Sequence, residues 1–275
     1  SRFGVALVLL GFLTSLTDLS VGVNASLQNR PDIFAGNFIG GSFVIVFLVL
    51  PLLAILKKGL PITQHLPKAK IIAFIGLISL PVLFAMDGRI QTIDSIVMII
   101  AYFFFLSFET YKKSAVKKTH SLFSKSVLKS IGKIGLAGSV ILVSCHFLVE
   151  GTGEIATMIG IPAFVISVVL LSLGTNVPEF SLAITSVLKK KTDVAFGDYI
   201  GSASLNPFML GVFSLISGPY ELGLNGFRSM LFVILIGNAL FLYVGFRKGR
   251  ISVPASVFLI ACYGIVIANQ VFAQS

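Results

Sequence analysis

The chain has 275 residues, of which 56% are hydrophobic and only 12% are charged, and its mean hydropathy is +0.98. This composition excludes an ordinary soluble domain and predicts an integral membrane protein embedded in a lipid bilayer. Many apolar runs approach the roughly 20 residues that a helix needs to cross a bilayer core. They lack the alternation of a membrane β-barrel, so we expect an all-α membrane protein.

Nine spans are predicted, and a basic segment at 110–133 separates the first four from the last five. The chain therefore divides into a first half (1–109), the basic segment (110–133) and a second half (134–275). In the basic segment, Phe123, Val127 and Ile131 recur between lysines, which is typical of an amphipathic helix at a membrane surface. A solvated linker is the alternative. The predicted spans are 3–26, 33–56, 70–87, 90–109, 135–152, 158–188, 194–217, 226–246 and 251–272.

The basic residues lie almost entirely on one side of these spans. If successive spans alternate in direction, every Lys and Arg except Arg30, Arg89 and Arg228 falls on the side where the chain begins. The positive-inside rule places that side in the cytoplasm. Topology therefore accounts for the net charge of +10, and we expect no nucleic-acid partner. Short loops favour a prokaryotic plasma (inner) membrane as the location.

Residues 174–206 place polar groups in an apolar region. Residues 174–179 read GTNVPE and residues 197–206 read GDYIGSASLN. A carboxylate at bilayer depth is costly and marks an ion or substrate path, and a proline break is tolerated where the backbone lines a cavity. Hydroxyl, amide and carboxylate oxygens are ligands for hard cations, and this stretch offers them on Thr175, Asn176, Glu179, Ser202 and Asn206.

The same pattern occurs earlier in the chain at a constant offset of 161 residues. The first copy enters from the side where the chain begins and the second from the opposite side. Two copies in opposite orientation predict an inverted-repeat transporter bundle, with its site at the midplane where broken helices meet. The matched pairs are Thr14–Thr175, Asp18–Glu179, Ser20–Ser181, Leu27–Leu188, Asp32–Asp193, Gly36–Gly197, Ile39–Ile200 and Gly40–Gly201.

With these motifs, residues 174–206 resemble the second α-repeat of the sodium/calcium exchanger (cation/calcium antiporter) superfamily, and residues 14–45 resemble the first. The resemblance implies ten spans in the family fold, of which this chain lacks the first. It also implies exchange of Ca2+ against Na+ or H+ by alternating access, with inorganic cations as partners and no cofactor. The ion ligands that it implies are Thr14, Ser15, Asp18, Thr175, Asn176, Glu179, Ser202 and Asn206.

The first repeat departs from the family pattern more than the second. Thr17 replaces the motif proline, Gly41 a serine, and Ile45 a ligating asparagine. In the second repeat, Asp198 and Ala203 each replace an asparagine. Fewer oxygen ligands predict fewer bound ions per cycle. We expect Asp198 to act as an acid near the N-terminus of its helix, with an orientation into the cavity as the alternative.

Three functional hypotheses follow. The first is a secondary cation antiporter that exchanges Ca2+ for Na+ or H+. The second is a degenerate family member that binds a cation as a sensor or structural subunit and does not transport it. The third is an antiporter for another cation. The chain shows no nucleophilic triad, cysteine pair or phosphate-cradling loop, so we expect no enzymatic activity.

Overall fold

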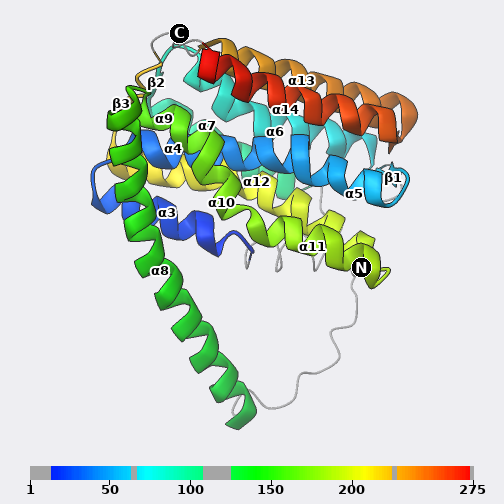
Figure 1. Ribbon diagram of the computed structural model, residues 1–275, viewed down its shortest axis with the longest axis horizontal. Coiled ribbons are helices and arrows are strands. Elements are labelled where there is room, and N and C mark those ends of the chain that lie inside the picture. The colour runs from blue at the N-terminus through cyan, green and yellow to red at the C-terminus, as the bar shows by residue number, and fades with distance from the viewer. Residues whose placement is uncertain (1–13, 63–66, 108–124, 225–227, 273–275) are drawn as a thin grey trace.

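The chain folds into a bundle of helices with two very short strand pairs (Figure 1). This computed structural model describes residues 14–62, 67–107, 125–224 and 228–272. The start of the predicted span 3–26 and most of the basic segment 110–133 lie outside the described residues. Each later predicted span overlaps one helix or one run of consecutive helices, although the helix over the predicted span 135–152 extends from residue 125 to residue 159.

In the first half, the helices are α3 (Leu16–Leu27), α4 (Pro31–Val44), α5 (Leu50–Leu56), α6 (Lys68–Ala85) and α7 (Thr92–Ser107), and the π-helix η2 (Ile45–Val49) joins α4 to α5. In the second half, they are α8 (Lys125–Ile159), α9 (Ala163–Ile166), the π-helix η3 (Ser167–Leu171), α10 (Ser172–Thr175), α11 (Val177–Leu188), α12 (Thr192–Ser217), α13 (Arg228–Lys248) and α14 (Val253–Phe272). The antiparallel strand pairs are β1 (Leu60–Pro61) with β4 (Arg250–Ile251), and β2 (Arg89–Ile90) with β3 (Tyr220–Glu221).

The inverted repeat is present as a structure. Helix α3 and helix α11 begin and end at positions 161 residues apart, and so do the run α4–η2–α5 and helix α12. The link within each copy turns through a residue with a left-handed backbone, Asn29 with φ 52° and Lys190 with φ 54°. The two links lie at opposite ends of the bundle (Figure 1), and Lys57 at the end of α5 donates a hydrogen bond to Thr192. These observations confirm the predicted fold class.

The predicted break in the second repeat occurs at Asn176, two residues before Pro178. There the helical run α9–α10 bends by 40° relative to α11. Proline is accepted in the first turn of a helix because an N–H group there needs no partner within the helix. Pro178 therefore starts the second segment rather than interrupting it. The corresponding position in the first repeat is Ser15, immediately before α3.

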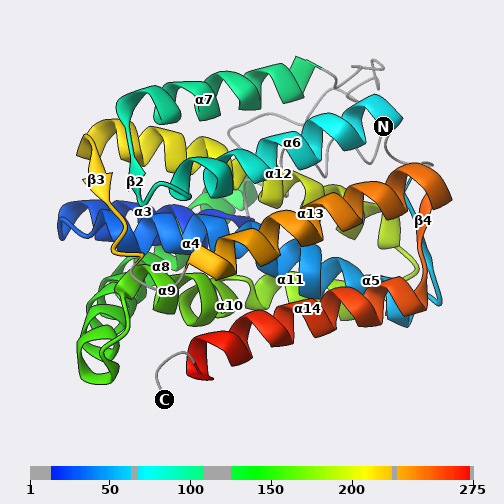
Figure 2. The ribbon, with the colours of Figure 1, turned by 90° about the horizontal axis from the view of Figure 1, so that it is seen from above.

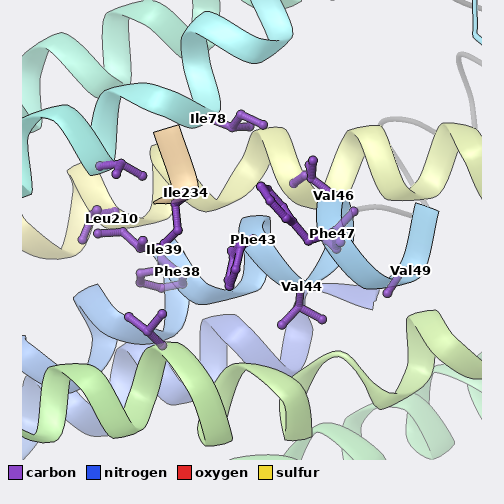
Figure 3. Close-up of a cluster of buried hydrophobic side chains, with 14 of the residues drawn as sticks. Phe38, Ile39, Phe43, Val44, Val46, Phe47, Val49, Ile78, Leu210 and Ile234 are labelled. Atoms are coloured by element: carbon purple, nitrogen blue, oxygen red, sulfur yellow. The ribbon is translucent and has the colours of Figure 1, made fainter. Parts of the chain in front are cut away.

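Helices α4 and α12 form the centre of the bundle (Figure 2). The most apolar window of Pro31–Leu56 is 78% buried and that of Thr192–Ser217 is 72% buried, whereas that of Leu136–Ile159 is 22% buried. Phe38, Phe43 and Phe47 of the first run pack into an apolar cluster with side chains of α6, α12 and α13 (Figure 3). The two central helices therefore occupy the positions at which buried side chains from both repeats can meet.

Within the described residues, four helices are long and apolar enough to cross a bilayer, and the bent pair α9–α11 is a fifth candidate. Helices α7, α13 and α14 contribute shorter apolar segments. Helix α8 begins at Lys125, so the last residues of the basic segment are continuous with the span that follows them. Its outer part extends beyond the rest of the bundle (Figure 1).

The strand pairs connect loops that alternating spans place on the same side. β1 and β4 join the basic loops that follow α5 and α13. At the other end, β2 pairs with β3, and Arg228 donates to the backbone carbonyl of Asp87. Both contacts agree with the predicted alternation of the spans.

Candidate functional site

The predicted ligand residues meet where the breaks before α3 and α11 face the middle of α4 and α12. Helix α3 begins at Leu16 and helix α11 begins at Val177, and the polar residues directly before these two helices lie in the interior. The acids follow in the first turn of each helix, with Asp18 2% exposed and Glu179 1% exposed. The other predicted ligands that are buried are Ser15, Thr175, Asn176, Ser202 and Asn206, and Thr14 is partly buried.

The two repeats are joined at this site by a crossed pair of hydrogen bonds. The Thr14 hydroxyl of the first repeat donates to Asp198 Oδ1 of the second at 3.1 Å. The Thr175 hydroxyl of the second repeat donates to Asn37 Oδ1 of the first at 3.3 Å. Thr14 corresponds to Thr175 at the 161-residue offset, and Asn37 corresponds to Asp198. Each helix break therefore contacts the returning helix of the other repeat.

Asp18 has an amide donor in this arrangement. Asn37 Nδ2 donates to Asp18 Oδ1 at 2.9 Å, and the Thr175 hydroxyl lies close to the same carboxyl group. Thr17 donates to the backbone carbonyl of Thr175 at 3.1 Å and so ties the start of α3 to the break before α11. The first-repeat acid is thus held by residues from both repeats.

Glu179 has a different environment. The Thr14 hydroxyl lies close to its carboxyl group but donates to Asp198, and Glu179 Oε2 is buried without a hydrogen-bond partner. Tyr199, which is fully buried, donates to the backbone carbonyl of Glu179 at 3.0 Å and fixes the main chain of this turn. The Asp18 carboxyl group, and to a smaller extent that of Asp198, act on Glu179 as negative charges. Asp198 Oδ2 is also buried without a partner.

The site therefore contains three buried acids, Asp18, Glu179 and Asp198. In the part of the chain that the structure describes, no Lys or Arg side chain forms an ion pair with any of them. An isolated buried carboxylate is unfavourable by several kcal/mol or more unless a cation or proton compensates it. No three His, Cys, Asp or Glu side chains among the described residues form a metal-binding group. A metal ion here would consequently be held by one or two carboxylates together with neutral oxygens.

Asn206 and Asn176 supply such oxygens. Asn206 Nδ2 donates to Ser42 Oγ at 3.3 Å, and Asn176 Nδ2 donates to the backbone carbonyl of Ser172 at 2.8 Å. With their amide nitrogens directed to protein partners, Asn206 Oδ1 and Asn176 Oδ1 remain buried without one. The Ser15 hydroxyl oxygen is in the same condition, and the Ser202 hydroxyl lies 2.8 Å from the Thr14 hydroxyl.

The expectation that Asp198 is an acid near the N-terminus of its helix is wrong. Asp198 lies six residues after the start of α12 at Thr192, is fully buried, and accepts the hydrogen bond from Thr14. Its partner position in the repeat, Asn37, was not predicted as a site residue. The offset that matches Gly36 with Gly197 also matches these two neighbours, so the repeat contained the signal that identifies both.

Two positions at which the first repeat lacks the polar residue of the family pattern, Ile45 and Gly41, are tightly packed. Ile45 is fully buried in the apolar core. A Cβ atom at Gly41 would lie 2.7 Å from Asn206 Nδ2, so a larger residue at this position would displace that amide. The returning helix of the first repeat therefore contributes Asn37 and Ser42 to the polar centre.

Two hollows at the surface of the described residues lie away from the predicted ligands. A hollow of about 430 Å³ next to Arg30 and Pro162, and another of about 400 Å³ next to Arg89 and Arg228, are lined by none of the predicted ligand residues. The buried carboxyl groups of Asp18, Glu179 and Asp198 therefore do not open into either of these two hollows.

Two inverted helix pairs that cross at buried acids are the arrangement of a secondary transporter. The chain belongs to the sodium/calcium exchanger protein family, whose sequence profile matches residues 1–111 and 129–272. This confirms the resemblance of the two repeats to that family and makes the chain a cation/calcium antiporter.

Known relatives are distant but extend over most of the chain. The putative antiporter CaxA of Alkalimonas amylolytica is 23% identical over 95% of this chain and 85% of its own length. The inner membrane protein YrbG of Escherichia coli K12 is 23% identical over 89% and 78%, and the sodium/calcium exchanger MaX1 of Methanosarcina acetivorans is 24% identical over 76% and 72%.

Solved structures of the sodium-calcium exchanger NCX_Mj share the fold. One of them, soaked with 2.5 mM Na+ and 1 mM Sr2+, superposes with a TM-score of 0.68 at 25% identity and covers 98% of this chain and 87% of that chain. A second, soaked with 100 mM Na+ and 10 mM Sr2+, has a TM-score of 0.68 at 24% identity.

Proposed function

We propose that this antiporter exchanges Ca2+ for Na+ or H+ by alternating access, and that the ion binds among the buried oxygens where the repeats cross. The observation that supports this most directly is a set of buried acids with no basic partner among the described residues. Their charge has to be compensated by something that enters from outside the fold. The ligands are Thr14, Ser15, Asp18, Thr175, Asn176, Glu179, Ser202 and Asn206.

The chemistry of this set favours a hard divalent cation. Ca2+ prefers six to eight oxygen ligands and accepts carboxylates, amide carbonyls, hydroxyls and backbone carbonyls in flexible geometry. The buried oxygens without partners on Asn176, Glu179 and Asn206 are of these types. The Cys145 thiol lies at the edge of this arrangement and donates to the backbone carbonyl of Thr17 at 3.8 Å, whereas the side-chain atoms of the predicted ligands that are buried without a partner are all oxygens.

Exchange follows from the same energetics. The acids cannot move through the occluded state as bare carboxylates, because the unfavourable free energy of an isolated buried charge blocks that transition. A bound Ca2+ removes this barrier, and so does a set of Na+ ions or protons. One ion type leaving on one side must therefore be replaced by the other before the empty site can reorient.

Orientation and location are part of the proposal. The basic ends of the spans face the cytoplasm, in accordance with the positive-inside rule. The pairing of β1 with β4, which brings two basic loops to one end, supports a common side for them. A prokaryotic inner membrane is supported by the relative YrbG, which is named an inner membrane protein.

A second candidate is a member of the fold that binds a cation without transporting it. Buried Ile45 at a ligand position of the family pattern favours this candidate, since the first repeat has lost one of its oxygens. Binding without flux would distinguish this candidate from the antiporter.

The test is 45Ca2+ uptake into proteoliposomes, first with an outward Na+ gradient and then with a proton gradient. Uptake driven by one gradient should be lost in Glu179→Gln and in Asp18→Asn. The matched control is Asp193→Asn, which neutralises an exposed acid at the start of α12 and should transport like the parent protein. Normal uptake by both site variants would refute the site assignment. Ca2+ binding without uptake under either gradient would favour the second candidate.

A further inference from the structure

The two halves of the site are related by the repeat but differ in charge. In the first half, Asp18 accepts a hydrogen bond from Asn37 and lies close to the Thr175 hydroxyl. In the second half, Glu179 lies close to the hydroxyl of Thr14, which corresponds to Thr175, but that hydroxyl donates its proton to Asp198. The position that corresponds to Asn37 is Asp198, and a carboxylate there has no N–H group to donate. The second half therefore has a second acid in place of a donor.

This difference leaves two buried oxygens without partners on neighbouring carboxyl groups. They are Glu179 Oε2 and Asp198 Oδ2, on side chains that are 1% and 0% exposed. No oxygen of Asp18 is in this condition. Two like charges in a buried setting repel one another strongly, and a cation that contacts both removes the repulsion and the lack of partners together.

Neutral oxygens surround the same place. Thr14 Oγ1 lies 3.1 Å from Asp198 Oδ1 and 2.8 Å from Ser202 Oγ. A hydroxyl group has two lone pairs besides its proton, so Thr14 and Ser202 can turn toward a cation without moving their oxygens. The two carboxylates and two hydroxyls come from both repeats, as an ion that couples the repeats requires.

We propose that Asp198 is a further direct ligand of the transported cation, which lies toward the second-repeat half of the site and has Glu179, Asp198, Thr14 and Ser202 among its ligands. This inference rests on the proposed function, because it locates the ion within that same site. Asp198 then replaces, from the second repeat, the ligand that the first repeat has lost at Ile45. The selectivity of the site for a divalent ion depends on this added charge, since affinity for Ca2+ rises with the number of charged ligands.

The informative variant is Asp198→Asn, which removes the charge and keeps an oxygen that can accept the bond from Thr14. If Asp198 serves only as that acceptor, the variant binds Ca2+ like the parent protein. If Asp198 is a ligand, we expect the dissociation constant for Ca2+ to rise about tenfold or more. Asp193→Asn, on the same helix and exposed, is the control and should bind normally.

The measurement is equilibrium binding of 45Ca2+ to purified protein, with thermal unfolding in detergent at several Ca2+ concentrations as a second readout. The Ca2+-dependent rise in melting temperature should shrink in Asp198→Asn, while its melting temperature without Ca2+ stays the same or rises because the repulsion from Glu179 is gone. If Asp198→Asn does not fold, Asp198→Ser is measured in its place with the same expectation, since serine keeps an oxygen and removes the charge.

The outcomes separate this inference from the proposed function. Parent protein that neither binds nor transports Ca2+ would overturn both. Parent protein that binds Ca2+, loses binding in Glu179→Gln and keeps its affinity in the Asp198 variants would leave the proposed function intact and overturn the role of Asp198. Loss of affinity in Glu179→Gln and in the Asp198 variants, with normal binding in Asp193→Asn, would support both.

Discussion

Gly40 lies where α4 crosses the helical run that carries the second-repeat break, and a single methyl group there should uncouple the two repeats. A Cβ atom at this position would collide with the backbone carbonyl of Val168 and lie 2.6 Å from Ser172 Oγ. Ordinary contact begins at 3.4 Å, so the helices must separate by roughly 1 Å. The Thr175–Asn37 hydrogen bond is already 3.3 Å long, and hydrogen bonds fail beyond about 3.5 Å.

Gly40→Ala should therefore lower the free energy of unfolding by about 1–3 kcal/mol through overpacking and abolish most Ca2+ uptake. The matched control is Gly76→Ala on α6, where a Cβ atom would meet nothing within 4 Å. That change should stabilise the helix by about 0.5–1 kcal/mol and leave transport unchanged. The assay is thermal unfolding in detergent together with 45Ca2+ uptake in proteoliposomes. Equal stability and equal uptake in the two variants would refute the reasoning from helix contact.

Three further predictions concern the polar centre. Asn37→Asp should place a second carboxylate beside Asp18 and so lower the melting temperature of the protein without Ca2+. Adding Ca2+ should restore the melting temperature. A variant that melts at the same temperature as the parent protein without Ca2+ would contradict the like-charge argument. Tyr199→Phe removes the hydrogen bond to the Glu179 backbone carbonyl. The free energy of unfolding should therefore fall by about 1 kcal/mol, as measured by calorimetry, and Ca2+ binding should weaken moderately. At a Ca2+ concentration of 100 times the dissociation constant, bound Ca2+ should stabilise the protein by about 2.7 kcal/mol, and a chelator should remove this stabilisation. A melting temperature that does not change with Ca2+ concentration would exclude tight binding.

Much of the architecture was predictable because it depends on local sequence. A span is defined by the length of an apolar run, and the repeat is defined by matched positions at a constant offset, so neither requires knowledge of a distant contact. The structure reproduces that offset at both ends of α3 and α11. The break before α11 was also predictable from Pro178, although its position at Asn176 depended on where a proline fits in a helix.

The polar centre was predictable only in part. Asp18 and Glu179 stand out because acids are rare and costly in a membrane span. The offset pairs Asn37 with Asp198, but it does not show whether these two side chains face the site, water or a helix end. Their roles depend on the crossed bonds with Thr175 and Thr14, which join residues 138 and 184 positions apart.

What the sequence determined by itself is thus the membrane class, the inverted repeat, the family pattern and the two acids, since hydrophobic length and internal matching carry that information. The tertiary structure alone decided which side chains share one buried volume. It showed that Asn37 donates to one acid whereas Asp198 adds charge beside the other. The physical reason is that hydrogen bonding and charge compensation are settled by distances of about 3 Å between segments that only folding brings together.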